Sequence, residues 1–109
     1  MSTDELGTAA ATAVEQCLGL DASESCAIVT DDERRPIGEA LYDAASAVTD
    51  DAVLLQYAPG DQHGEEPPRP VAAAMADADA FLAPTTKSIS HTRARGDACD
   101  AGARGATLP

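Results

Sequence analysis

The feature that most constrains the fold is an alternation of short apolar runs with longer, alanine-rich segments. Three runs are rich in Val, Ile, Leu or Phe, at 25–30, 52–57 and 80–83. Such runs, bounded by polar residues or proline, are typical of buried parallel strands. The segments between them carry apolar residues at helical spacing. Strand and helix in regular alternation predict parallel strands joined by right-handed crossovers.

The other elements follow from the same patterns. We expect four helices and one more strand: helices at 7–18, about 36–48, 71–78 and about 90–101, and a strand at 104–108. The acidic residues 31–33 would open the second helix, because carboxylates complement the positive end of a helix. The Gly- and Pro-rich stretch 59–70 is expected to be a loop. The prediction is an α/β fold, a Rossmann-like four-stranded parallel sheet flanked by helices, with β-α repeats after an amino-terminal helix.

The chain has 109 residues, the length of one domain. Its aromatic residues are Tyr42, Tyr57 and Phe81, so few large side chains can fill a core. We therefore expect helices that pack closely through alanine. The cysteines have no C-x-x-C spacing and lie in apolar or alanine-rich runs, which favours small buried side chains at all three positions: Cys17, Cys26 and Cys99.

Charge is distributed unevenly along the chain. The formal net charge is −12, and 15 of the 19 acidic residues lie within positions 1–66. An acidic surface repels nucleic acid and anionic membranes, so neither is expected as a partner. The acidic amino terminus has no hydrophobic run of a secretory signal, and no stretch approaches the roughly 18 apolar residues of a membrane span. The sequence predicts a cytoplasmic protein.

Lysine occurs once, at Lys87. Acid-rich, lysine-poor surfaces are typical of proteins that stay dissolved in concentrated salt, where self-repulsion is screened. We therefore expect a halophilic protein, and an ordinary acidic cytosolic protein is the alternative. A melting temperature that rises from low to molar KCl would distinguish the first from the second.

The segment 85–109 differs from the rest of the chain, because it holds four of the seven basic residues and a series of hydroxyl side chains. It begins where the third predicted strand ends, and ligands of parallel α/β sheets bind outside the carboxyl ends of the strands. We place a candidate substrate or inter-domain cleft on six residues of this segment: Thr86, Ser88, Ser90, His91, Thr92 and Arg95.

Two interpretations of these residues remain open. A helix that begins near Ser90 offers unpaired N–H groups, and Arg93 and Arg95 could add donors for a carboxylate or phosphate. This predicts an anion site or a docking point for an acidic partner. The alternative is a serine cap followed by solvated arginines, with Arg93 paired to Asp97 one turn later.

No complete catalytic or metal motif occurs in the sequence. G-x-S-x-G, G-x-G-x-x-G and G-x-x-x-x-G-K-[ST] are absent. The loop at 59–70 contains four side chains of metal-ligand type: Asp61, His63, Glu65 and Glu66. The H-E-x-x-H spacing is absent, so we interpret them as polar side chains exposed to solvent rather than as a metal site.

A wider pattern of residues resembles a known family. The carboxyl-terminal segment reads S-I-S-H-T at 88–92, followed by Ala94-Arg95, Ala98, Gly102-Ala103-Arg104 and Leu108-Pro109. Upstream lie Val29-Thr30-Asp31, Glu66-Pro67 and Ala78-Asp79. Together these residues resemble the M29 family of metal-dependent aminopeptidases, of the aminopeptidase T and S type.

The resemblance implies that residues 1–109 are the amino-terminal domain of a larger two-domain enzyme that removes amino-terminal residues from peptides. In that family two divalent metal ions, zinc or cobalt, are held by the carboxyl-terminal domain, which this chain lacks. The resemblance therefore predicts no catalytic residue and no metal in this fragment, which is expected to be inactive alone. The missing domain is the expected partner, and a homodimer is one expectation for the full-length protein.

Two alternatives follow. A relative in the same fold family cleaves the ring of a dihydroxypyridine with iron, so the chain could be a domain of a ring-cleaving dioxygenase. It could also be a stand-alone α/β binding module for an anionic ligand or an acidic partner.

Overall fold

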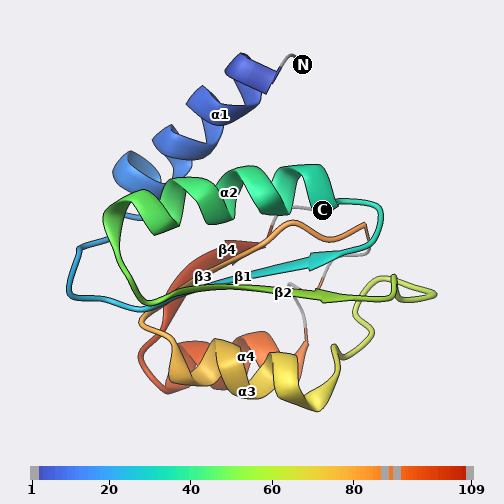
Figure 1. The fold of residues 1–109 in the computed structure, drawn as a ribbon. Helices are drawn as coiled ribbons and strands as arrows, with labels where there is room; N and C mark the ends of the chain where they lie inside the picture. The colour runs from blue at the N-terminus through green and yellow to red at the C-terminus, as the bar shows by residue number, and fades with distance from the viewer. Residues whose placement is uncertain (1–2, 87–88, 90–91, 108–109) are drawn as a thin grey trace.

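The protein forms one parallel sheet covered by helices on both faces (Figure 1). The computed structural model describes residues 3–86, 89 and 92–107. Four strands pair in parallel in the order β2-β1-β3-β4, with bounds Cys26–Asp31 for β1, Ala52–Tyr57 for β2, Ala80–Ala83 for β3 and Arg104–Thr107 for β4. The predicted α/β fold is confirmed.

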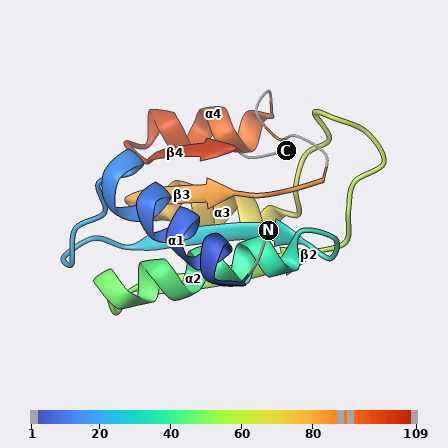
Figure 2. The same ribbon diagram turned by 90° about the horizontal axis from the view of Figure 1, so that it is seen from above.

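The helices form two layers. The first layer contains α1 (Thr3–Thr12), which continues into the π-helical turn η1 (Ala13–Cys17), and α2 (Arg35–Val48). The second layer contains α3 (Arg69–Asp77) and α4 (Arg93–Asp100), which pack side by side on the opposite face of the sheet (Figures 1 and 2). No helix among the described residues combines the length and the apolar character needed to cross a membrane.

The core consists of one cluster on each face of the sheet. Alternate residues of β1 point to opposite faces, as strand geometry requires, so Ile28 joins the cluster under α2 and Val29 joins the cluster under α3. All six residues of β1 are buried, because this strand has a neighbour on each side and a helix layer on each face. The largest fully buried side chain is Phe81 of β3.

Small residues set the spacing between the layers, as the composition predicted. A Cβ placed at Gly38 of α2 would lie 2.8 Å from the Cβ of Thr30 in β1. Ala45 and Ala98 are completely buried on α2 and α4. The helices therefore approach the sheet more closely than larger side chains would allow.

Three local predictions were wrong. Cys26 is buried, but Cys17 and Cys99 are exposed, because they lie on the solvent sides of η1 and α4. The helix expected at 7–18 begins at Thr3 and ends in a π-helical turn. The acidic residues 31–33 do not form the first turn of α2, since Asp31 is the last residue of β1 and the helix begins at Arg35.

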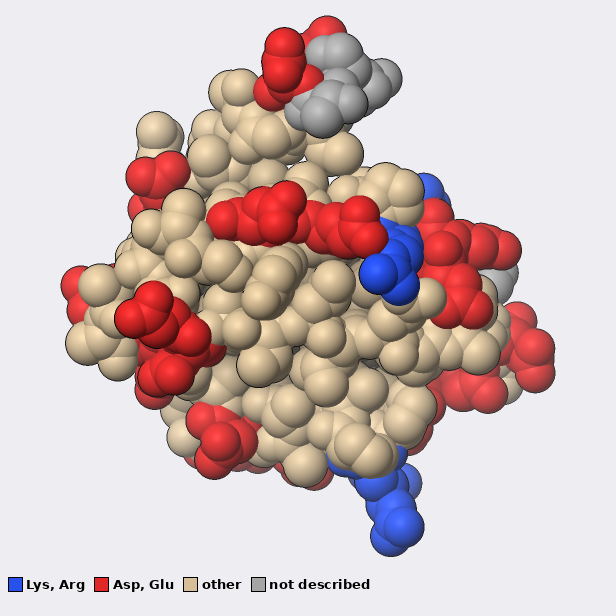
Figure 3. Space-filling model, viewed as in Figure 1, with Lys and Arg blue, Asp and Glu red and all other residues tan. Residues whose placement is uncertain are grey.

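On the face shown in Figure 3, acidic side chains form separate groups over the upper helix layer and toward the left and right edges, with neutral residues between them. On this face the basic side chains gather toward the end of the sheet where β1 and β2 terminate. Among the described residues, ion pairs join Arg35 to Glu39 and Arg104 to Glu24.

Candidate functional site

The carboxyl ends of the strands define the edge at which a site is expected. From β1 the chain passes to β2 on one side, whereas from β3 it passes to β4 on the other side. The topological switch point therefore lies between the carboxyl ends of β1 and β3, where open α/β sheets bind their ligands. The residues at this point are Asp31 on β1 and the segment that follows Ala83 on β3.

At the switch point, Asp31 joins neighbouring segments of the chain through hydrogen bonds. Its side chain is 1% exposed, and its carboxylate accepts the backbone N–H of Thr86 at 2.6 Å and the Thr86 hydroxyl at 3.1 Å. The same carboxylate accepts the backbone N–H of Arg34 at 3.0 Å, immediately before α2. One residue therefore connects β1, the start of α2 and the segment after β3.

Packing reinforces this connection. The Thr30 hydroxyl donates to the carbonyl of Pro84 at 3.1 Å, and both residues are fully buried. Thr85 is 1% exposed. Thr86, the first of the predicted site residues, thus belongs to a packed corner whose polar groups already bond one another.

The start of α4 is capped by a threonine. Thr92 is the N-cap residue, and its side-chain oxygen accepts the backbone N–H of Arg95 at 3.2 Å. Its hydroxyl donates to the carbonyl of Ile89 at 2.7 Å. The cap was predicted to be a serine near position 90, but the helix begins at Arg93, so the capping role falls to Thr92.

A carboxylate from another part of the chain occupies the amino terminus of α4. The two oxygens of Glu66 accept the backbone N–H groups of Arg93 and Ala94, at 2.7 Å and 3.1 Å. An anion at this helix terminus was predicted, and the anion is the chain's own Glu66. These two N–H groups are therefore bonded within the chain.

The predicted site residues fall into separate groups. Ser88, Ser90 and His91 lie outside the described residues. The described hydrogen bonds of Thr86 lead to Asp31 and Glu33, whereas Thr92 and Arg95 bond each other at the start of α4. Arg95 is half-buried, and its Nε has no hydrogen-bond partner among the described residues.

The predicted Arg93–Asp97 pair is not among the ion pairs of the described residues. The arginines at the start of α4 are instead joined to the rest of the fold through the backbone, by Glu66 at Arg93 and by Thr92 at Arg95.

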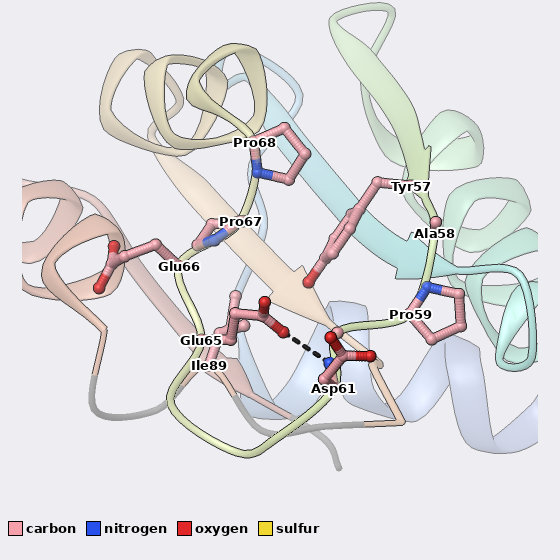
Figure 4. A pocket seen from close by; sticks show the side chains of 10 residues that line it. Tyr57, Ala58, Pro59, Asp61, Glu65, Glu66, Pro67, Pro68 and Ile89 are labelled. Carbon is pink, nitrogen blue, oxygen red and sulfur yellow. Dashed lines mark hydrogen bonds between the residues drawn. The ribbon is translucent and has the colours of Figure 1, made fainter.

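A pocket next to this helix was not predicted from the sequence. It has a volume of about 300 Å³ and lies between the carboxyl end of β2, the loop that follows it and Ile89 (Figure 4). The residues that line it are Tyr57, Ala58, Pro59, Gly60, Asp61, Glu65, Glu66, Pro67, Pro68 and Ile89. The sequence feature that could have indicated this pocket is the Gly- and Pro-rich stretch directly after a predicted strand.

The polar groups of the pocket are negative. Burial, together with the charges of Asp31 and Glu65, raises the pKa of the Tyr57 hydroxyl. The Glu65 carboxylate accepts the backbone N–H of Asp61 at 2.6 Å and so closes the loop on itself. A Cβ at Gly60 would overlap a carboxylate oxygen of Glu65, so a larger residue there would displace the end of the Glu65 side chain.

The described residues offer no metal site. No three His, Cys, Asp or Glu side chains within 3–86, 89 and 92–107 are grouped so that they could hold a metal ion. In the loop after β2, Glu65 and Glu66 bond backbone N–H groups instead. The zinc or cobalt ions implied by the family resemblance thus find no donor set in this part of the chain, and no reaction step is assigned to them.

Comparison with known proteins supports the fold. No protein-family model and no curated protein matches the sequence. Among solved structures, a 2,5-dihydroxypyridine dioxygenase from Pseudomonas putida is similar over 99% of this chain, with a TM-score of 0.76 and 13% identity. The chain spans 35% of the length of that protein. At this level of identity, the likeness shows a shared α/β fold.

Proposed function

We propose that this chain is the amino-terminal domain of a larger metal-dependent aminopeptidase of the T and S type. In this proposal the carboxyl edge of the sheet, with the pocket at Tyr57 and the start of α4, forms one wall of a cleft. The metal-holding domain forms the other wall. The domain shapes the cleft and does not itself carry out catalysis.

The observation that carries the first part of the proposal, a domain of a longer protein, is the extent of the fold likeness, whereas the aminopeptidase part rests on the residue pattern of the sequence. The whole described sheet and both helix layers correspond to 35% of a longer enzyme, so this fold occurs as one part of a larger catalytic protein. In the sequence, the residues that resemble the aminopeptidase pattern follow β3, whose carboxyl end lies at the edge of the sheet where such folds bind ligands.

A second candidate is a domain of a ring-cleaving dioxygenase. It is favoured by the name of the similar structure, a 2,5-dihydroxypyridine dioxygenase. The stand-alone module for an anionic ligand has less support, because Glu66 already occupies the N–H groups on which an anion at α4 would depend.

The test begins with the encoding DNA beyond the codon for Pro109. We expect an open frame that continues into a segment rich in Glu, His and Asp. The longer product, expressed and loaded with Zn²⁺ or Co²⁺, should hydrolyse leucyl-p-nitroanilide, whereas the 109-residue chain with the same metals should not.

The possible results separate the candidates. Cleavage of 2,5-dihydroxypyridine by the Fe²⁺-loaded longer product, without peptidase activity, would replace the aminopeptidase proposal with the dioxygenase. A stop codon directly after Pro109 would favour a stand-alone module. Hydrolysis of the leucyl substrate by the 109-residue chain would contradict the non-catalytic role.

A further inference from the structure

The pocket beside Tyr57 has the opposite charge from the site that the sequence suggested. The sequence placed basic residues and a helix terminus at this edge and so predicted an anion. The lining contains no Lys or Arg among the described residues, whereas three of its side chains are carboxylates: Asp61, Glu65 and Glu66. The positive end of α4 offsets part of the Glu66 charge, because Glu66 is bonded directly to it, so the charge available to a ligand comes from Asp61 and Glu65.

The walls of the pocket suit carbon groups. The Tyr57 ring, three proline rings and Ile89 are among the residues that line it (Figure 4). Figure 4 shows the Tyr57 hydroxyl directed toward the Glu65 carboxylate. An aromatic face attracts cations as well as alkyl groups.

The negative charge is fixed in position. The hydrogen bond from the Asp61 N–H holds the Glu65 carboxylate against the turn at Gly60. The raised pKa of the Tyr57 hydroxyl, caused by burial and by the charges of Asp31 and Glu65, agrees with a negative potential at the centre of the pocket.

We propose that this pocket binds an organic cation, with an alkylammonium group whose carbon atoms contact Tyr57 and the prolines and whose charge faces Asp61 and Glu65. A metal ion fits less well, because the described residues supply no group of three side chains that could hold one. A volume of about 300 Å³ is sufficient for a small quaternary ammonium compound. The proposal is independent of the reaction of the longer enzyme.

The test uses a charged and a neutral probe of the same shape. The ¹⁵N-labelled chain is titrated at low salt with choline and, separately, with 3,3-dimethyl-1-butanol. We expect saturable amide shifts at Gly60, Asp61 and Glu65 with choline, at a Kd on the order of 1–10 mM for one cation–π contact and two exposed charges. The neutral probe should bind at least about fivefold more weakly, and KCl should weaken choline binding.

Substitutions locate the site. Glu65→Gln keeps an oxygen for the Asp61 N–H but removes the charge, and it should raise the Kd for choline about twofold to fivefold. Tyr57→Leu should raise it by a similar factor through the loss of the aromatic face, whereas Tyr57→Phe should leave it nearly unchanged. Asp43→Asn removes the same charge from α2, on the other side of the sheet, and should have no effect.

Several results would overturn the proposal. Equal binding of the two probes would show that charge plays no part. Unchanged choline affinity in Glu65→Gln, with its spectrum still that of a folded protein, would place the ion elsewhere. The same amide shifts with Mg²⁺ or Zn²⁺ at lower concentration would indicate a metal site instead.

Discussion

Three helices begin at the carboxyl edge of the sheet, and two of them, α2 and α4, start beside a carboxylate, but the two carboxylates have different origins. At α2 the carboxylate is Asp31, which ends the preceding strand, bonds Arg34 and is 1% exposed. At α4 it is Glu66, an exposed residue of the loop after β2 that lies 27 positions before Arg93.

The difference shows how much of the fold depends on each residue. Asp31 also accepts two hydrogen bonds from Thr86, so its loss would affect three segments at once. At α4 two residues accept the first N–H groups of the helix. Thr92 bonds the Arg95 N–H from within the same segment, and Glu66 bonds the Ala94 N–H from a distant loop. We therefore expect the start of α2 to be sensitive to a single substitution and the start of α4 to be tolerant.

The largest effect is expected for Asp31→Ala. The substitution leaves the N–H groups of Arg34 and Thr86 without their acceptor in a buried corner, which should lower the free energy of unfolding by about 2–4 kcal/mol. Urea unfolding followed by circular dichroism measures the change.

The neighbouring Asp32 provides the control. It is exposed and accepts one hydrogen bond, from Gln56. Asp32→Ala should therefore change the free energy of unfolding by about 0.5 kcal/mol or less. Equal losses for Asp31→Ala and Asp32→Ala would contradict the role assigned to Asp31.

The next effect concerns the local cap of α4. Thr92→Ala removes the acceptor for the Arg95 N–H and should cost about 1 kcal/mol of unfolding free energy. Thr92→Ser, which keeps the hydroxyl, should recover most of that loss. If alanine and serine were equally destabilising, the methyl group rather than the cap would be the important part of Thr92.

A smaller effect is expected for the distant carboxylate. Glu66→Gln loses the charge at the positive end of α4 and one of the two acceptor oxygens, since an amide nitrogen cannot accept, and it should cost about 0.5 kcal/mol at low salt. The loss should shrink in molar KCl because the charge is screened. The double variant with Thr92→Ala tests whether the two contacts compensate for each other. A decrease in unfolding free energy larger than the sum of the two single decreases would show that each contact partly replaces the other.

The ion pair of Glu24 and Arg104 lies outside both helix starts. Its removal should change stability least, by an amount that depends on pH. The hydrogen bond from Arg104, followed by that from the Asp21 N–H, lowers the pKa of Glu24 from 4.5 to about 2. A lowered pKa in the folded state adds stability above pH 4.5, which is lost as the pH falls toward 2. The melting temperatures of wild type and Arg104→Gln should therefore converge below pH 4.5, and a constant difference would contradict this.

The sequence predicted what depends on local patterns. Strands 52–57 and 80–83 were predicted with the bounds observed for β2 and β3, and the parallel sheet followed from their alternation with helices. The contact of Glu66 with α4 joins residues far apart in the chain and has no local pattern. Because the sequence does not reveal this contact, the basic residues near Arg93 suggested an anion site. The adjacent pocket is instead lined by carboxylates. The exposure of Cys17 and Cys99 depends on which side of a short helix faces the sheet, which alanine-rich segments leave ambiguous.

The central position of β1 also has a consequence for motion. The strand pairs with both β2 and β3, whereas β4 is attached to the sheet through β3 alone. Opening of β4 would break the β3–β4 pairing and the bonds of Arg104, but exposure of the amides of β1 requires that the sheet separate on both sides. The amide hydrogens of Ile28 and Val29 should therefore exchange with solvent only when the whole domain unfolds, while those of β4 exchange through partial opening.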